Sequence, residues 1–225
     1  MSRTPDLIDE AHSQSQTKDR ILDAAEHLFS QHGFVATSLR QITTEARVNL
    51  AAVNYHFQSK ESLILAVLMR KIAPINRHRL ELLDQLESGG QPLVLEEVLH
   101  AFFAPLFDAR RAGVSISNFP KLLGRAYTEP GDWMQRVFPE AFAQIAARFS
   151  AAMRSALGGV DMTELMWGMH FAIGSMAHFT AAGSLLTFIS GGKADPEDFD
   201  GALDRLVRYT ASGLRALTMK KEVAR

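Results

Sequence analysis

The sequence predicts an all-α protein of about nine helices, with an N-terminal three-helix domain that contains a helix-turn-helix and a C-terminal helical bundle. Apolar residues recur every three to four positions along most of the chain, strand patterning is weak, and glycine and proline separate the periodic segments. The length of 225 residues, 47% of them hydrophobic, is sufficient for two domains. We therefore expect three parts: residues 1–16, 17–60 and 61–225.

The first part of the chain lacks an apolar core and leads into a periodic segment. Residues 1–16 are polar and acidic, so we expect a disordered tail that is not a secretory signal. Thr17 is a candidate cap for the first helix, whose apolar stripe includes Ile21 and Phe29. Gly33 is placed to end this helix in a left-handed conformation.

Three further helices follow at short intervals. Thr37 or Ser38 caps the second helix, and Asn49 caps the third. Ser59 begins a long fourth helix, which we expect Pro74 to kink or break.

The C-terminal part continues the helical pattern. Residues 88–92 read as a linker, and a helix is expected over 93–110. A segment over 115–127 is interrupted by a proline, and the next helix covers about 132–157. A last helix is expected from Asp195 and the proline after it to about Met219.

One helix of this region carries no charge. Residues 165–192 contain no Asp, Glu, Lys or Arg, and Asp161 with Glu164 forms a capping box before them. The 28 residues could span a bilayer by length. Against a membrane protein stand two histidines, several serines and threonines, and the lack of flanking basic residues or a second span. We therefore expect a buried helix in a core or a dimer interface, and no membrane partner.

Composition and motifs narrow the function. The chain has no cysteine, which excludes disulfides, thiolate zinc sites and cysteine nucleophiles and suits a reducing cytoplasm. It has no nucleophile elbow, zincin, phosphate-loop or dinucleotide-binding motif, so we expect no enzyme and no cofactor. The formal net charge is −1, so overall charge does not indicate nucleic acid. The alternatives that remain are a helical-bundle enzyme and a membrane-associated helical protein.

The helix-turn-helix is the most informative segment. Residues 37–57 read TSLRQITTEARVNLAAVNYHF, two short helices around a tight turn. Ile42, Ala46 and Val53 take buried positions of the general template, and Arg47 takes the turn position that most often carries glycine. Arginine there is expected to cost about 1 kcal/mol in backbone strain.

The exposed side of this segment supplies side chains suited to DNA. Asparagine pairs bidentately with adenine, alanine and leucine contact thymine methyl groups, and tyrosine, histidine and basic residues reach phosphates. The candidate DNA-binding residues are Thr37, Ser38, Arg40, Gln41, Arg47, Asn49, Leu50, Ala51, Ala52, Asn54, Tyr55, His56 and Lys60. The alternative is a pair of amphipathic helices in an ordinary bundle.

The segment over residues 17–67 resembles the DNA-binding domain of TetR-family transcriptional regulators. The resemblance is carried by the motifs ILDAAEHLF, TSLRQI and YHFQSKESL, and Arg47 departs from the family's usual glycine. The resemblance implies a homodimer, a palindromic double-stranded DNA operator, and a C-terminal domain that binds a ligand and dimerises. We therefore expect this chain to be a repressor that is released from DNA by a small apolar or acyl ligand.

A narrower similarity links VNLAAVNYHF, KLLGRAYTEP and ELMWGMHFAIGSMAH to PsrA-like regulators, which respond to long-chain fatty acids. It implies a fatty acid or an acyl-CoA as the ligand. The sequence leaves the operator and the regulated genes open.

Candidate ligand contacts lie in the C-terminal part. An arginine in an apolar segment can pair with a carboxylate, and methionines adapt to irregular apolar ligands. The candidate pocket residues are Arg125, Met166, Met169, His170, Met176 and His178. The alternative for each is ordinary core packing or, for the arginine, an exposed helix end. Two histidines eight residues apart on a helix are about 12 Å apart, too far to share a metal ion, so no metal is expected.

Overall fold

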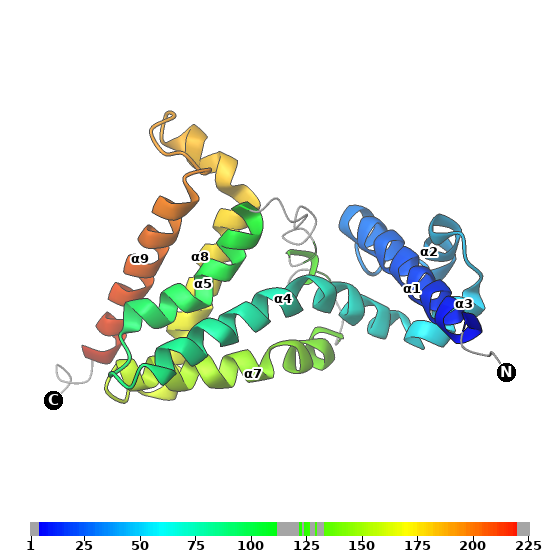
Figure 1. Ribbon diagram of the computed structural model, residues 1–225. Helices are drawn as coiled ribbons and strands as arrows, with labels where there is room; N and C mark the ends of the chain where they lie inside the picture. Colours follow the sequence, from blue (N-terminus) through cyan, green and yellow to red (C-terminus); the bar gives the residue numbers. More distant parts are fainter. Residues whose placement is uncertain (1–4, 112–121, 123, 127–128, 130–132, 220–225) are drawn as a thin grey trace. The chain divides into compact units, whose positions relative to one another are not determined.

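The computed structural model describes residues 5–111, 122, 124–126, 129 and 133–219, and in these residues all regular structure is helical (Figure 1), which confirms the predicted fold class. The helices are α1 Pro5–His32, α2 Leu39–Ala46, α3 Leu50–Phe57, α4 Lys60–Ser88, α5 Leu95–Arg111, α7 Trp133–Ala156, α8 Met162–Ile189 and α9 Phe199–Met219.

The chain folds into two units that each contain two separate stretches of sequence. Unit 1 comprises Met1–Ile72 and Ser117–Ala141, and unit 2 comprises Ala73–Ile116 and Phe142–Arg225. The chain therefore passes between the units within α4, between Ile72 and Ala73, and again on either side of Ser117–Ala141. The expected boundary at residue 60 differs from this division because the first turns of α4 and a later segment complete the core of unit 1.

The core of unit 1 holds α1, α2 and α3 in fixed positions. Phe29, Ile42 and Val53 are buried, one from each of these helices, and Leu63 of α4 joins them. The buried carboxylate of Glu26 on α1 pairs with Arg70 at 2.6 Å and with Lys71 at 3.0 Å, both on α4. Leu122 and Ala126, distant in sequence, belong to the same cluster.

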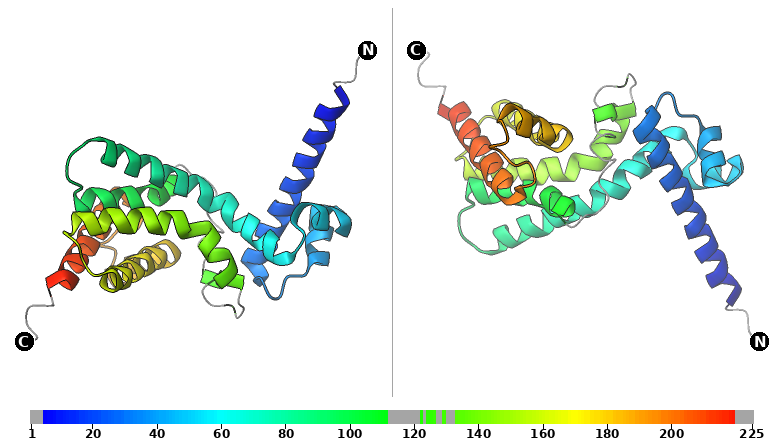
Figure 2. Two further views of the ribbon diagram at one scale, coloured as in Figure 1. Left: turned by 90° about the horizontal axis from the view of Figure 1, so that it is seen from below. Right: turned by 90° about the horizontal axis from the view of Figure 1, so that it is seen from above.

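Unit 2 brings α9 against both α5 and α8 (Figure 1). The close approach of α8 and α9 requires glycine at position 168, because a Cβ there would lie 2.3 Å from Cδ2 of Leu214. Beyond Thr180, α8 bends by 80°, and the two parts of α8 are visible in Figure 2. In the described residues, no single helix is long and apolar enough to cross a membrane, and only the two bent parts of α8 taken together meet that criterion.

Two sequence-based helix starts are wrong, and the expected break at Pro74 is absent. Helix α1 starts at Pro5, not after Thr17, so the segment after Pro5 is helical rather than a disordered tail. A proline in the first helical position is typical of a helix N-terminus and fits this early start. Helix α4 continues through Pro74, so the proline does not break it into two pieces, since one lost hydrogen bond does not end a helix of 29 residues that is packed on both sides of the proline. The start of α9 also lies later than predicted.

Helix α9 begins at Phe199 rather than near Asp195. Asp195 accepts a hydrogen bond from the backbone of Glu197 in a local turn, whereas Asp198 accepts one from Gly201 and so caps the helix. The segment expected over 115–127 lies mostly outside the described residues.

Candidate DNA-binding site

The start of α2 is fixed by a reciprocal cap. Ser38 Oγ accepts a hydrogen bond from the backbone N–H of Gln41, and Ser38 N–H donates to Gln41 Oε1 at 2.7 Å. Thr37 is 1% exposed and its hydroxyl donates to the carbonyl oxygens of Gly33 and Leu28. Thr37 therefore belongs to the scaffold of the turn, and the expectation that its side chain contacts DNA does not fit this placement.

The turn between α2 and α3 has the predicted backbone conformation. Arg47 has φ 54° and ψ 49°, so the positive φ expected at the glycine position of the template is confirmed. Its side chain is exposed, and Val48 N–H donates to the Thr43 carbonyl at 3.0 Å to close the turn. The guanidinium is thus available to a phosphate at the cost of backbone strain.

Replacing Arg47 by glycine tests the backbone strain and the proposed phosphate contact separately. We expect the Arg47→Gly variant to gain about 1 kcal/mol in the free energy of unfolding, because glycine adopts positive φ without steric cost. It should also bind DNA more weakly with a flatter salt dependence, because a phosphate contact is lost. Arg47→Ala is the matched control, which should lose the same contact without the gain in stability. Thermal unfolding and salt-dependent binding check both, and a lower melting temperature for Arg47→Gly would contradict the strain.

Helix α3 is anchored by its cap and by two buried side chains. Asn49 Oδ1 accepts a hydrogen bond from Ala52 N–H at 2.8 Å, and Val53 and Phe57 lie in the core. Of the two asparagines considered for adenine recognition, Asn49 is therefore engaged in the cap, and Asn54 is exposed on the helix surface.

The remaining face of α3 is open to a partner. Tyr55 is 71% exposed and Leu50 is 44% exposed. The exposed candidates on this part of unit 1 are Ser38, Arg40, Gln41, Arg47, Asn49, Leu50, Ala51, Asn54 and Tyr55, while Ala52, His56 and Lys60 are half-buried. The structure thus brings most of the predicted DNA-binding residues together on α2, α3 and the turn that joins them.

Lys60 lies at the first position of α4 and contacts the loop after α1. Its Nζ donates to the carbonyl oxygen of Val35 at 3.3 Å. Burial lowers the pKa of Lys60 from its usual value, and the carboxylates of Glu61 and Glu129 oppose this change. Lys60 therefore ties the loop to α4 while its charge remains close to the helix N-terminus.

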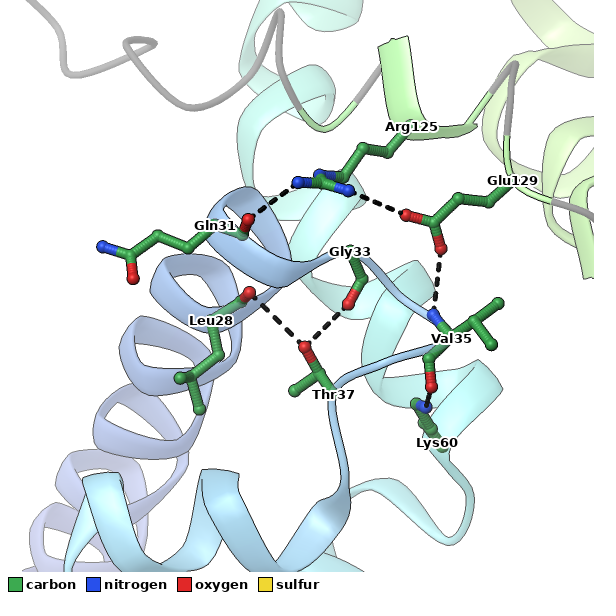
Figure 3. Close-up of polar contacts among 8 residues, drawn as sticks. All are labelled: Leu28, Gln31, Gly33, Val35, Thr37, Lys60, Arg125 and Glu129. Carbon is green, nitrogen blue, oxygen red and sulfur yellow. Dashed lines mark hydrogen bonds and ion pairs between the residues drawn. The ribbon is translucent and has the colours of Figure 1, made fainter.

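Arg125 and Glu129 complete this loop from a distant part of the sequence (Figure 3). Arg125 Nη2 donates to the carbonyl oxygen of Gln31 at 2.7 Å, and Val35 N–H donates to Glu129 Oε2 at 2.9 Å. Arg125 Nη1 and Glu129 Oε1 are 3.3 Å apart. We call these contacts the loop clamp. Arg125 therefore contacts the DNA-binding unit, which corrects its proposed place in a ligand pocket.

Sequence reasoning missed Glu129, although one local signal was available. Arg125 and Glu129 are four residues apart, the spacing of an ion pair on one helix face, as are the buried Leu122 and Ala126. The target of the clamp, the end of α1, lies 94 residues earlier and leaves no mark in the local pattern.

The other residues predicted to line a ligand pocket all lie on α8, some on its buried side and some on its exposed side. Met169 and Met176 are buried, whereas Met166, His170 and His178 are exposed. None of them lines the groove of about 730 Å³ among α4, α5 and α9, or the groove of about 620 Å³ among α5, α8 and α9. Among the described residues, no group of three or more acidic or histidine side chains could hold a metal ion.

A helix-turn-helix whose second helix is exposed, on a rigid three-helix scaffold, defines a class of DNA-binding proteins. Comparison with known families shows which family of DNA-binding proteins this chain resembles. The family described as bacterial regulatory proteins, tetR family, matches residues 21–67, and the family described as tetracyclin repressor-like, C-terminal domain, matches residues 100–213. The chain belongs to the TetR family of transcriptional regulators.

Relatives and solved structures agree with this assignment. The transcriptional regulator AcrR of Shigella flexneri is 37% identical over 98 residues, which are 43% of this chain and 45% of AcrR. The match thus spans less than half the length of that relative. A putative transcriptional regulator from Pseudomonas aeruginosa PAO1 has a TM-score of 0.60 at 18% identity, covering 88% of this chain and 90% of that one. A putative fatty acid metabolism regulator of Clostridium perfringens has a TM-score of 0.58 at 15% identity, with 86% and 97% covered.

Proposed function

We propose that this chain is a dimeric, ligand-responsive repressor that binds a palindromic DNA operator through α3. The observation that carries the proposal is the exposed face of α3. Asn54, Tyr55 and Leu50 stand on a helix fixed by a cap and a buried core, and Arg40 and Arg47 flank it. A rigid helix with polar and small side chains on its free face fits the major groove.

A palindromic operator has two half-sites, so the proposed repressor binds it as a dimer. The exposed side of α8 and α9 carries large apolar residues, including Trp167, Phe171 and Tyr209, which are 55%, 58% and 70% exposed. Exposed aromatic side chains on two packed helices are suited to a second copy, with which they would form a four-helix interface. In the dimer, the two α3 helices would enter successive major grooves about 34 Å apart.

The connection between the units gives a route for regulation. Residues 122–129 fall within the region that matches the C-terminal family, yet Leu122, Ala126 and the loop clamp belong to unit 1. A ligand bound in unit 2 can act on α3 through α4 and through this segment. It changes DNA affinity only if it binds the operator-bound and released states with different affinity.

The ligand is expected to be small and apolar, and an acyl compound such as a fatty acid or an acyl-CoA is the narrower form of the proposal. The PsrA-like motifs and the buried methionines of α8, Met169 and Met176, support it. A repressor of this kind acts on the chromosome, so we expect the protein in the cytoplasm.

The test is direct binding of the full chain to DNA. Fragments of genomic DNA that the purified protein retains should share an inverted repeat, and footprinting should show two protected half-sites one helical turn, or a multiple of it, apart. Binding only to random DNA, with no shared repeat, would refute the proposal.

Lys60 gives a quantitative check of the phosphate contacts. A dimer that loses one phosphate contact per subunit should show a salt slope, log K against log [salt], flatter by about 1.8. We expect this of Lys60→Ala, whereas Lys193→Ala in unit 2 serves as a matched control and should leave the slope unchanged. An unchanged slope for Lys60→Ala would remove Lys60 from the DNA contacts and leave it only its bond to Val35.

A further inference from the structure

Two charged side chains are buried in the described part of the chain, and only one of them is paired with opposite charges there. Glu26 in unit 1 is 6% exposed and is neutralised by two cations. Arg79 on α4 in unit 2 is 3% exposed, and no described carboxylate lies within ion-pair distance of it. Burying a charge without a counter-ion costs free energy. Glu26 avoids this cost through its two ion pairs, whereas Arg79 has no counter-ion among the described residues.

The contacts of Arg79 account for only part of its guanidinium. Nε donates to the carbonyl oxygen of Phe102 at 2.7 Å, and Nη1 donates to Oδ1 of Asn76 at 3.0 Å. The group also lies over the ring of Phe102, with Cζ 4.4 Å from its centroid. Because a guanidinium has five N–H donors, three remain without an acceptor among the described residues.

The surroundings of this cation are apolar. Phe102 meets the buried Phe149 of α7 edge to face at 5.2 Å, and Phe103, next in sequence, is fully buried. Burial lowers the pKa of Arg79 to about 10, which still leaves the side chain charged at neutral pH. The site therefore presents a permanent positive charge inside an aromatic environment.

We infer that Arg79 anchors the carboxylate of an apolar ligand in unit 2. The inference rests on the proposed function in that unit 2 is the ligand-binding part of the chain, and it specifies the ligand class as an apolar monoanion. Two of the remaining N–H groups can hold both carboxylate oxygens, the geometry that arginine favours. The aromatic side chains then surround the apolar part of the same molecule, and the incoming negative charge neutralises the buried cation.

The experiment compares carboxylic acids with their uncharged amides on the full chain. Decanoate with decanamide, and 2-naphthoate with 2-naphthamide, are titrated by calorimetry and by thermal shift. We expect at least one acid to bind about 10- to 100-fold more tightly than its amide, because the amide lacks the charge that strengthens the hydrogen bonds. The Arg79→Gln variant should lose this preference.

Controls separate anchoring from a structural role. Arg148→Gln removes a half-buried cation of the same unit, paired with Asp84 and Glu87, and should keep the preference for acids. If Arg79→Gln does not fold, Arg79→Lys keeps the charge without the planar fork, and the preference should fall without disappearing. Equal affinity for acid and amide in both pairs, or a full preference in an Arg79 variant, would overturn the inference.

Operator binding is measured separately in the absence of ligand. Failure of the wild-type chain to bind any operator would refute the proposed function while leaving the preference for acids intact. A wild-type chain that binds its operator normally but shows no preference for acids would refute the anchor alone.

Discussion

Replacing Asn54 by alanine is expected to weaken specific operator binding by at least about 30-fold. A bidentate contact between an asparagine and adenine contributes about 1–3 kcal/mol of discrimination, and a symmetric dimer loses it at both half-sites, about 2–6 kcal/mol in total. Asn54 is exposed on α3, and alanine is the better helix former, so the free energy of unfolding should not fall. Fluorescence anisotropy with the operator and with a scrambled duplex measures the effect.

The control for this variant uses the other asparagine of the motif. Asn49→Ser preserves the cap on Ala52 N–H, because serine is an equally good N-cap residue, and it should change operator affinity far less than Asn54→Ala. The salt slope should be the same for wild type and Asn54→Ala, since a base contact neutralises no phosphate. Equal loss of affinity for the operator and for the scrambled duplex would show that Asn54 does not read sequence.

The features that sequence reasoning predicted well have causes within a few residues. The Ser38 cap, the Asn49 cap and the positive φ of Arg47 each depend on a hydrogen bond or a steric limit inside one turn. The helix-turn-helix face follows from these local constraints together with helical periodicity. Most of the candidate DNA-binding site could therefore be derived before the structure was known.

The features that were missed depend on tertiary contacts. Arg125 was predicted to face a ligand, because an arginine in an apolar segment has no local partner, but its partner is the Gln31 carbonyl, 94 residues away. Arg79 was not considered, because its burial depends on α5 and α7 and its own sequence neighbourhood is polar. Burial and long-range hydrogen bonds are the two properties that a single sequence does not encode locally.

The loop clamp predicts the second large effect, at Gly33. This residue has φ 90°, and a Cβ placed on it would lie 2.0 Å from Glu129 Oε1 and 2.7 Å from Arg125 Nη1. Gly33→Ala should therefore lose about 1–2 kcal/mol from the backbone conformation. It should lose about 0.5–1.5 kcal/mol more when the displaced carboxylate gives up its hydrogen bond to the exposed Val35 N–H, which then binds water. The total of about 1.5–3.5 kcal/mol corresponds to a fall in melting temperature of about 3–14 °C for a chain of this size.

Gly158 provides the matched control for the backbone part of this cost. It has φ 72° after α7, and nothing lies within 4 Å of the Cβ position, so Gly158→Ala should show the conformational cost without the clash. The difference between the two alanine variants measures the contact between Gly33 and the clamp. Equal losses for both would mean that Glu129 does not lie against Gly33 in solution.

A double-mutant cycle then links the clamp to regulation. In a Glu129→Ala background, Gly33→Ala should cost less than it does in the wild type, because the carboxylate that clashes most closely is gone and only the Arg125 guanidinium stays near the Cβ position. If the clamp transmits the ligand signal, Glu129→Ala should also reduce the ratio of operator affinities without and with ligand, while operator affinity without ligand stays near that of the wild type. A variant that loses stability but keeps the full ligand response would show that the 122–129 segment supports the DNA-binding unit without coupling it to unit 2, and that α4 alone carries the signal.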